Sequence, residues 1–244
     1  MTIAGLDRLP WLVHGFGTAV WREADFAESP RLKDFHPVIM HQLHSDIVHR
    51  LDAAPRERLN GDALMTNAAG LLLVVRTADC LPVLLVDETR RAVAAVHCGW
   101  RGTRARILDK VIREMHSAYG SRPADVLAAL GPCIGPCCYD VGPEVRASFL
   151  AAGFPRSVFA DPAAATSLRT AENSRPSTGH PFLNLRAANA WLLQSLGVPP
   201  AGIFDVDACT RCEPRLVSYR RNKGEKRRLY NFIGIFASAA PVAF

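Results

Sequence analysis

Three short apolar runs, close together in the chain, constrain the fold of these 244 residues most strongly. They read LLLVVRT (71–77), PVLLVD (82–87) and AVAAVH (92–97), and turn-like residues separate them. Runs of this length that are rich in branched residues are typical of strands buried on both faces of a sheet. The DETR segment between the second and third run favours a tight hairpin turn. We therefore expect buried strands here, the last two joined as a hairpin.

Two helices are expected in the middle of the chain. Thr103 is a candidate cap for a helix over 104–119, and Gly120 would close that helix. Apolar residues recur at helical spacing inside this range, which gives the helix one buried face. Pro143 suits the first position of the second helix, which should end before Gly153.

Further strands and one more helix follow towards the C-terminus. LRAANAWLLQSLG predicts a helix over 185–197 with Gly197 as its terminator, after a surface excursion over 155–179. The expected strands are VLAALG, IFDVDA, LVSYRR and LYNFIGIFA. Strands and helices intermingle, and no linker divides the chain. We therefore predict a single α/β domain over 1–244, a sandwich with a mixed β-sheet flanked by helices.

The composition is that of an ordinary globular protein, with 49% hydrophobic and 21% charged residues. No apolar run approaches the length that spans a bilayer, and the N-terminus lacks the basic region and apolar core of a secretory signal. We therefore expect a cytoplasmic protein that does not contact membranes. Seven cysteines are an odd number, so a disulfide framework cannot pair them all. Buried, metal-bound or catalytic thiols are favoured instead.

The net charge of +6 is partly concentrated in one segment, RRNKGEKRR, over 220–228. A basic surface can attract nucleic acid or an anionic small substrate such as phosphate. No aromatic residues interleave with these charges, as a stacking platform for single strands requires. We interpret the segment as a solvated hairpin loop and expect no nucleic acid partner. A non-enzymatic protein that binds polyanions through this loop is the alternative.

Polar side chains of the kinds that bind metals follow three of the expected strands. The segments are MHQLHS with His41, Gln42 and His44, TADCLP with Asp79 and Cys80, and VHCGW with His97 and Cys98. Strand ends are where an α/β sheet usually assembles its site. We therefore expect the functional site among these segments.

Two chemistries suit such residues, and their spacing does not decide between them. Two histidines and one cysteine form a ligand set that zinc accepts, and a vacant fourth position is the catalytic pattern. Zinc would lower the pKa of its bound water to about 7. Alternatively, Cys80 is a nucleophile and His97 its base, as in cysteine hydrolases.

Two acidic and several glycine-flanked residues complete the candidate site. Asp62 and Asp79 are candidates for acid–base work, and either could instead orient a ligand histidine. The glycines of HCGWRG permit close backbone approach at a helix start, where free N–H groups together with Arg101 favour an anion. Arg220 in SYRR is a second candidate for anion binding.

Five further cysteines occur in two short segments, CIGPCC and CTRC, as Cys133, Cys137, Cys138, Cys209 and Cys212. Two pairs of cysteines can build a structural zinc site with four thiolates. The glycine–proline turn in LGPCIGPCC also suits cysteines that pack as small hydrophobic residues. The sequence favours the packing interpretation.

Six motifs together resemble one protein family over the chain from about Val38 to the C-terminus. They are HQLHSDIV, GDALMT, TADCLPVLLVD, AAVHCGWRGT, LGPCIGPCCYDVGPEV and CT…SYRR. The family was first named for multicopper polyphenol oxidoreductases, or laccase-domain proteins, and is now understood as purine nucleoside phosphorylases with adenosine deaminase side activity.

The resemblance implies a metal centre and a set of reactions. Zinc would be bound by His44, Cys80 and His97, and Gln42 would join the two arginines in binding substrate or phosphate. The reactions are phosphorolysis of adenosine, inosine, guanosine and methylthioadenosine, and deamination of adenosine. The implied partners are purine nucleosides and inorganic phosphate, and a monomer or small homo-oligomer is expected. Some bacterial relatives are linked instead to editing of peptidoglycan precursors.

Two positions depart from the family pattern, and the histidine content limits what the family's older name implies. Ala19 stands where an arginine is expected, so phosphorolysis is weakened or Arg22 substitutes for that arginine. Asn184 stands where an aspartate is common. The chain has eight histidines and no closely spaced His-x-His pattern, too few for the copper clusters of a laccase. Copper remains the alternative metal for a single two-histidine, one-cysteine site, with polyphenol oxidation as the corresponding activity.

Overall fold

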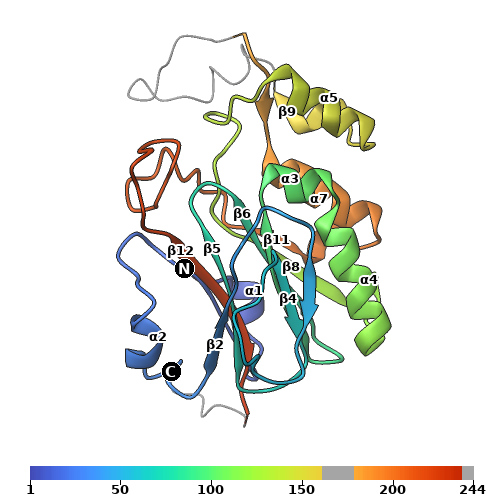
Figure 1. Ribbon diagram of the computed structural model, residues 1–244. Coiled ribbons are helices and arrows are strands. Elements are labelled where there is room, and N and C mark those ends of the chain that lie inside the picture. Colours follow the sequence, from blue (N-terminus) through green and yellow to red (C-terminus); the bar gives the residue numbers. More distant parts are fainter. Residues whose placement is uncertain (161–178, 238–244) are drawn as a thin grey trace.

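Two β-sheets packed against each other form the centre of the molecule in the computed structural model, which describes residues 1–160 and 179–237 (Figure 1). The first sheet has four strands in the order β1–β12–β5–β2. Its strands are β1 (Leu12–Phe16), β12 (Leu229–Ile235), β5 (Leu71–Thr77) and β2 (His36–Ile39). Strand β2 runs parallel to β5, and the other pairings are antiparallel, so this sheet is mixed.

The second sheet has six strands in the order β11–β8–β6–β7–β4–β3. They are β11 (Ile203–Asp205), β8 (Val126–Leu130), β6 (Leu81–Asp87), β7 (Ala92–Cys98), β4 (Ala63–Thr66) and β3 (Val48–Arg50). Both edge pairs are parallel and the inner pairs antiparallel, so this sheet is mixed as well. The sandwich flanked by helices is confirmed, but the one mixed sheet of the sequence analysis is two.

The three apolar runs are the three central strands β5, β6 and β7, and all are buried almost throughout. The expected hairpin joins β6 to β7, and its turn is closed by Asp87, which accepts the amides of Thr89 and Arg90 at 3.0 Å. Strand β5 belongs to the other sheet, so residues 78–80 carry the chain from one sheet to the other. This crossing is where the candidate site forms.

Apolar side chains of both sheets fill the space between them, with Leu73 and Val75 from one sheet meeting Leu84 and Val93 from the other. Helices cover the outer face of the six-stranded sheet (Figure 1). They are α3 (Trp100–Arg104), α4 (Ile107–Tyr119) and α7 (Leu185–Ser195), and α5 (Pro143–Ala151) lies beyond them at the top of Figure 1. The remaining described α-helices and strands are α1 (Ala4–Asp7), α2 (Asp25–Glu28), β9 (Phe159–Ala160) and β10 (Phe182–Leu183), and three short 3-10 helices lie at Pro123–Asp125, Arg156–Val158 and Pro200–Gly202.

The predicted helix over 104–119 is two helices in the structure. Its start was wrong, because Thr103 lies inside α3, where its amide donates to Gly99 O at 2.8 Å. The buried Thr103 hydroxyl accepts from Asn189 Nδ2 at 3.0 Å rather than capping a helix. The helical path is interrupted at Arg106, which has a left-handed φ of 60° and directly precedes α4. The predicted end is confirmed, since Gly120 closes α4 with a φ of 72°.

The other two helices lie where they were expected. α5 begins at Pro143 and ends before Gly153, and Asn184 caps α7 by accepting the amide of Ala187 at 3.0 Å. LVSYRR was wrongly predicted as a strand, because these residues form turns. Residues 161–178 of the predicted surface excursion lie outside the described part. Among the described helices, none combines the length and the apolar character needed to cross a bilayer.

Candidate active site and metal centre

His44, Cys80 and His97 meet at one point, although they come from three separate parts of the chain. His44 lies in the loop after β2, Cys80 in the crossing between the sheets, and His97 near the end of β7. The ligand atoms of the three side chains all lie within 4.8 Å of one another. The two imidazole rings meet edge to face, with centroids 4.9 Å apart. We call this group the His–Cys–His triad.

Asp79 shapes the crossing that presents Cys80. Its φ of 90° is rare for a residue with a side chain, and such strain persists where the surroundings enforce it. The Asp79 carboxylate accepts the Thr210 hydroxyl and the Arg220 amide, both at 2.6 Å. The Asp79 carbonyl accepts the amide of Ile134 at 2.9 Å. The strained corner is therefore held by contacts to two distant loops.

Asp62 holds both histidines of the triad. It is fully buried, and its carboxylate lies 2.7 Å from His97 Nδ1. A carboxylate only accepts, so Nδ1 carries a proton, and Nε2 is the ring nitrogen that a metal ion could bind in place of its proton. The same carboxylate accepts the amides of Leu43, His44 and Ser45 and the Ser45 hydroxyl. These bonds fix the loop that carries His44, whose own φ of 58° is left-handed.

The charges within this group support one another. Burial opposes ionisation of Cys80, but the His97 charge and hydrogen bonds from both histidines lower the pKa of the thiol to about 6. Burial disfavours the imidazolium of His97, yet the Cys80 charge and the Asp62 carboxylate raise its pKa to about 9. Burial also opposes ionisation of Asp62, and hydrogen bonds from His97 and Ser45 lower its pKa to about 2. The site therefore favours a thiolate at Cys80 and a carboxylate at Asp62.

The two glycines of HCGWRG are needed for close packing around the triad. A Cβ at Gly99 would lie 3.1 Å from Cys80 Sγ and 3.2 Å from His44 Cδ2. A Cβ at Gly102 would lie 2.9 Å from the carbonyl oxygen of Ser45. The close approach expected from the sequence is present: the backbone at Gly99 and Gly102 lies against the segments that carry His44 and Cys80.

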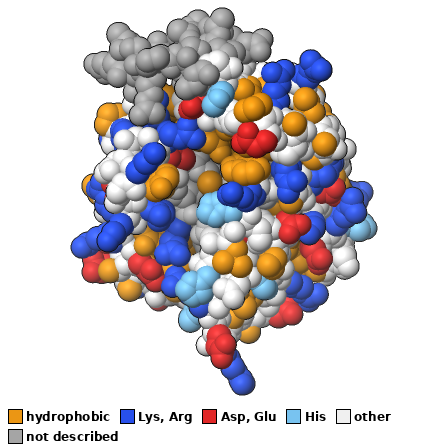
Figure 2. Space-filling model, turned by 45° about the horizontal axis from the view of Figure 1, so that its top comes forward, with side chains coloured by type: hydrophobic (Ala, Val, Ile, Leu, Met, Phe, Trp, Pro, Cys, Tyr) orange, Lys and Arg blue, Asp and Glu red, His pale blue; other side chains and the backbone are white. Residues whose placement is uncertain are grey.

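The triad opens into a cavity of about 670 Å³. Five cations line it, and they are Arg76, Arg101, Arg220, Lys226 and Arg228. Aromatic rings of Trp100, Tyr139 and Tyr219 form other parts of its wall. Figure 2 shows a hollow on this face of the molecule with Lys and Arg side chains and a histidine beside it. A hollow with this charge suits an anionic ligand with an aromatic part.

The acidic, ligand and substrate-binding residues predicted for the site lie at this cavity or directly behind it, whereas His41 and Cys98 of the candidate segments do not line it. Gln42 lines the cavity, but its side-chain amide is engaged with the Arg76 backbone, donating at 2.8 Å and accepting at 2.7 Å. Arg101 stacks on Trp100, with its guanidinium carbon 4.5 Å from the ring centroid. Arg220 forms an ion pair with Asp140 and thus shares its charge.

The departures from the family pattern do not all fall at the cavity. The exposed Arg22 pairs with Asp25 at 3.2 Å and does not line the cavity. Arg22 therefore does not take the place of the missing arginine in this structure. Ala19 packs on a small apolar cluster of Leu216, Val217 and Leu229.

Sequence reasoning missed several groups of the site, among them Tyr139 and Tyr219 of the cavity wall. Arg76, Lys226 and Arg228 line the cavity, and Thr210 holds Asp79 from behind. The basic segment 220–228 was interpreted as a solvated loop, whereas Arg220, Lys226 and Arg228 face the cavity. The density of basic residues in that segment was the available signal for an anion site. Only the fold shows which of these side chains line the cavity.

The donor set of the triad fits a metal ion. Two imidazoles, one of them oriented by a buried carboxylate, and a thiol whose ionisation is favoured are ligands for a zinc-type centre with one position left open to the cavity. The fold and the site thus define an α/β sandwich protein with a pocket whose wall carries a metal-type ligand set. This pocket lies where the chain crosses between the two sheets.

Comparison with known proteins agrees with this class. The model of the family described as multi-copper polyphenol oxidoreductase laccase matches residues 22–236, and the chain belongs to this family. The chain is 35% identical over 229 residues to a protein of Shigella flexneri named purine nucleoside phosphorylase YfiH, covering 91% of this chain and 86% of that protein.

A second relative and a solved structure extend the comparison. The chain is 40% identical over 152 residues to adenosine deaminase RL5 from an unknown prokaryotic organism. That match covers 62% of this chain and spans about half, 53%, of the relative's length. The crystal structure of a Bacillus licheniformis hypothetical protein, YfiH, matches with a TM-score of 0.80 at 25% identity, covering 94% of each chain.

Proposed function

We propose that this chain is a zinc-dependent purine nucleoside phosphorylase that also deaminates adenosine. The observation that carries the proposal is the convergence of His44, Cys80 and His97 at the wall of a basic, aromatic cavity. Relatives named purine nucleoside phosphorylase and adenosine deaminase support the choice of substrate. Adenosine, inosine, guanosine and methylthioadenosine are the substrates to be tested.

The triad would hold the zinc ion, and bound zinc would supply Lewis-acid polarisation and a water of lowered pKa. Asp62 keeps His97 Nδ1 protonated and so directs Nε2 towards the ion. Asp62 itself is fully buried and accepts five hydrogen bonds, which suits a positioning residue rather than a group that exchanges protons.

Asp79 is the better candidate for moving a proton. It lines the cavity, and each of its oxygens accepts one hydrogen bond, which leaves a second acceptor position on each. In deamination this carboxylate would take a proton from the attacking water and deliver it to the leaving amine. Tyr139 and Trp100 offer flat surfaces on which a purine ring can stack.

Phosphate binding is assigned to the cations of the cavity. Arg101 and Lys226 have no acidic partner among the hydrogen bonds and ion pairs of the described residues, and Arg228 donates to backbone carbonyls only. Arg220 is less free because Asp140 shares its charge. In phosphorolysis these side chains would hold the phosphate dianion beside the ribose and screen its charge.

The test supplies adenosine to the zinc-loaded protein with and without phosphate and follows inosine, adenine and ribose 1-phosphate. We expect inosine in both conditions, and adenine with ribose 1-phosphate only when phosphate is present. His44→Ala should abolish both activities. His41→Ala is the matched control, because His41 is an equally exposed histidine of the same loop that lies outside the triad. Absence of product from every purine nucleoside would overturn the proposal.

A cysteine hydrolase is the second candidate function, and the lowered pKa of Cys80 beside His97 favours it. Such an enzyme would act on an amide of a cell-wall precursor, with Cys80 as nucleophile and His97 as base. It predicts activity in chelator and covalent labelling of Cys80 by iodoacetamide. Retained zinc that shields the thiol, with loss of activity in chelator, would exclude it.

Copper-dependent polyphenol oxidation, the activity in the family's description, is less well supported. Among residues 1–160 and 179–237, the triad is the single group with histidines close enough to share an ion, and it contains two of them. A trinuclear copper cluster needs many imidazoles. One copper in the triad is the most this arrangement offers.

A further inference from the structure

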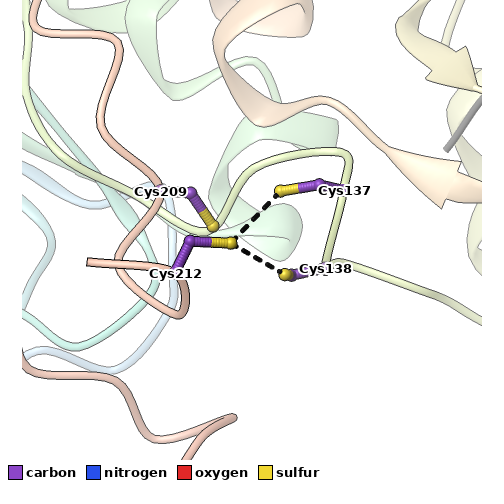
Figure 3. A group of neighbouring side chains, drawn as sticks. All are labelled: Cys137, Cys138, Cys209 and Cys212. Atoms are coloured by element: carbon purple, nitrogen blue, oxygen red, sulfur yellow. Dashed lines mark hydrogen bonds between the residues drawn. The ribbon is translucent and has the colours of Figure 1, made fainter. Parts of the chain in front are cut away.

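A second group of sulfurs lies outside the triad. Cys137 and Cys138, in the turn between β8 and α5, face Cys209 and Cys212, in the loop after β11 (Figure 3). Cys212 Sγ lies 3.7 Å from Cys137 Sγ and 3.4 Å from Cys138 Sγ. All four sulfurs lie within 4.8 Å of one another, and none is joined in a disulfide. We call this group the four-cysteine cluster.

The two S···S distances from Cys212, 3.4 and 3.7 Å, are close to those around a tetrahedral ion. With Zn–S bonds of about 2.3 Å, a regular tetrahedron has S···S edges of about 3.8 Å. Apolar packing alone gives no reason for four thiols to point at one centre. We therefore propose that Cys137, Cys138, Cys209 and Cys212 bind one structural zinc ion, a site separate from the triad and independent of the proposed activity.

Local backbone geometry supports four converging sulfurs. Neighbouring residues usually point apart, but a turn in which Cys138 and Tyr139 both donate to Gly135 O lets Cys137 and Cys138 face the same point. Cys209 and Cys212 have the two-residue spacing common in zinc sites, and Cys212 donates to Cys209 O at 3.1 Å. Each pair thus comes from one tight turn.

The surroundings of the cluster include one backbone donor to sulfur and one buried cation. The amide of Gly135 donates to Cys209 Sγ at 3.2 Å, a bond that stabilises a charged sulfur. The buried guanidinium of Arg186 donates to the carbonyls of Cys133 and Ala208 at the base of the two turns. Zinc binding would release the four thiol protons to solvent and leave a complex of net charge −2. Arg186 also pairs with Asp205 and Asp207, so its charge is shared.

The cluster would fix one wall of the cavity. Backbone bonds from Cys133 N to Ala208 O and from Thr210 N to Cys133 O already join the two loops. Tyr139, directly after Cys138, lines the cavity, and Thr210, directly after Cys209, donates to Asp79. A closed set of four thiolates leaves no open position for substrate, so the role is structural.

Metal content of purified variants tests the proposal. We expect two zinc ions per chain in the wild type, one in Cys80→Ala, one in Cys212→Ser and none in the double variant. Cys133→Ala is the matched control, a buried cysteine of the same turn outside the cluster, and should keep two. One zinc in the wild type, with none in Cys80→Ala, would overturn the proposal.

Cobalt substitution provides a test that holds even if Cys212→Ser does not fold. Four of the five cysteines proposed as ligands belong to the cluster, so Cys80→Ala should retain about four fifths of the thiolate-to-cobalt absorption of the wild type. Loss of all this absorption in Cys80→Ala would contradict the site. A disulfide or an iron centre found at these cysteines in freshly purified protein would contradict it as well.

Discussion

The two groups of cysteine ligands differ in their donors and in what they face. The His–Cys–His triad mixes one sulfur with two imidazoles, has strained backbone at His44 and Asp79, and faces a basic cavity. The four-cysteine cluster has sulfur donors alone, held by ordinary turns, and none of its members lines that cavity. Three protein ligands beside a cavity leave a coordination position for substrate or water, as in catalytic metal sites. Four protein ligands fill the coordination shell, as in structural metal sites. Changes at the triad should therefore alter turnover, and changes at the cluster should alter stability.

The largest effect is expected from Cys80→Ala. Loss of this thiolate removes a metal ligand whose Lewis-acid contribution is worth several kcal/mol, so nucleoside turnover should fall by more than about 10³-fold. The melting temperature, compared in chelator so that metal binding does not contribute, should change little, because Cys80 lies at the cavity rather than in a core. Steady-state assays and thermal unfolding measure the two effects. Turnover within tenfold of the wild type would show that the triad does not drive the reaction.

Cys212→Ser should have the opposite profile. Loss of the structural metal is expected to cost roughly 3 kcal/mol, near the upper end for single substitutions, and to lower the melting temperature by about 10 °C. Zinc at the triad should be retained. The control Cys133→Ala should lose about 1 kcal/mol, as for an ordinary buried substitution. Thermal unfolding at matched zinc concentration makes the comparison, and equal losses in both variants would remove the distinction between the cluster and plain packing.

Asp62→Asn separates positioning from ligation at the triad. The amide cannot accept all five hydrogen bonds that the carboxylate accepts, and its NH₂ group would face donors. We expect zinc affinity at the triad to fall about 10- to 100-fold, the range for groups that orient ligands. Competition with a chromophoric chelator measures this affinity. Asp52→Asn, at an exposed aspartate paired with Arg50, is the control, and the same affinity in both variants would contradict the assigned role.

The smallest effects come from a matched pair of glycines. A Cβ at Gly99 would crowd Cys80 and His44, and one at Gly135 would lie 3.3 Å from Cys137 Sγ. Gly99→Ala should reduce turnover about tenfold with the melting temperature kept, because a small misplacement of catalytic groups is costly. Gly135→Ala should cost about 1 kcal/mol of stability through overpacking and retain turnover. If both variants lost turnover and both kept the melting temperature of the wild type, the two sites would not be functionally separate.

Sequence patterns predicted the fold where local signals are strong. The apolar runs gave β5, β6 and β7, and Pro143 and Gly120 marked helix ends correctly, because these residues act on their own backbone. The division into two sheets depends on the crossing after Thr77, which no periodicity records. Thr103 was misplaced because its hydroxyl bonds to Asn189, which is distant in sequence.

The candidate site shows the same limit. Residue types and family motifs singled out the triad, but only the fold brings His44, Cys80 and His97 together. For the four cysteines of the cluster the sequence favoured packing, because the glycine–proline turn of LGPCIGPCC also suits small buried side chains. Only the fold shows that this turn faces Cys209 and Cys212. The sequence of the basic segment 220–228 does not show which side chains face the site. In the structure three of them line the cavity.

The most direct test of the central claim is an anomalous difference map recorded at the zinc edge from crystals of the wild-type chain. The account predicts a strong peak within bonding distance of His44, Cys80 and His97. The absence of a peak among these three side chains, in crystals of protein that turns over adenosine, would contradict it.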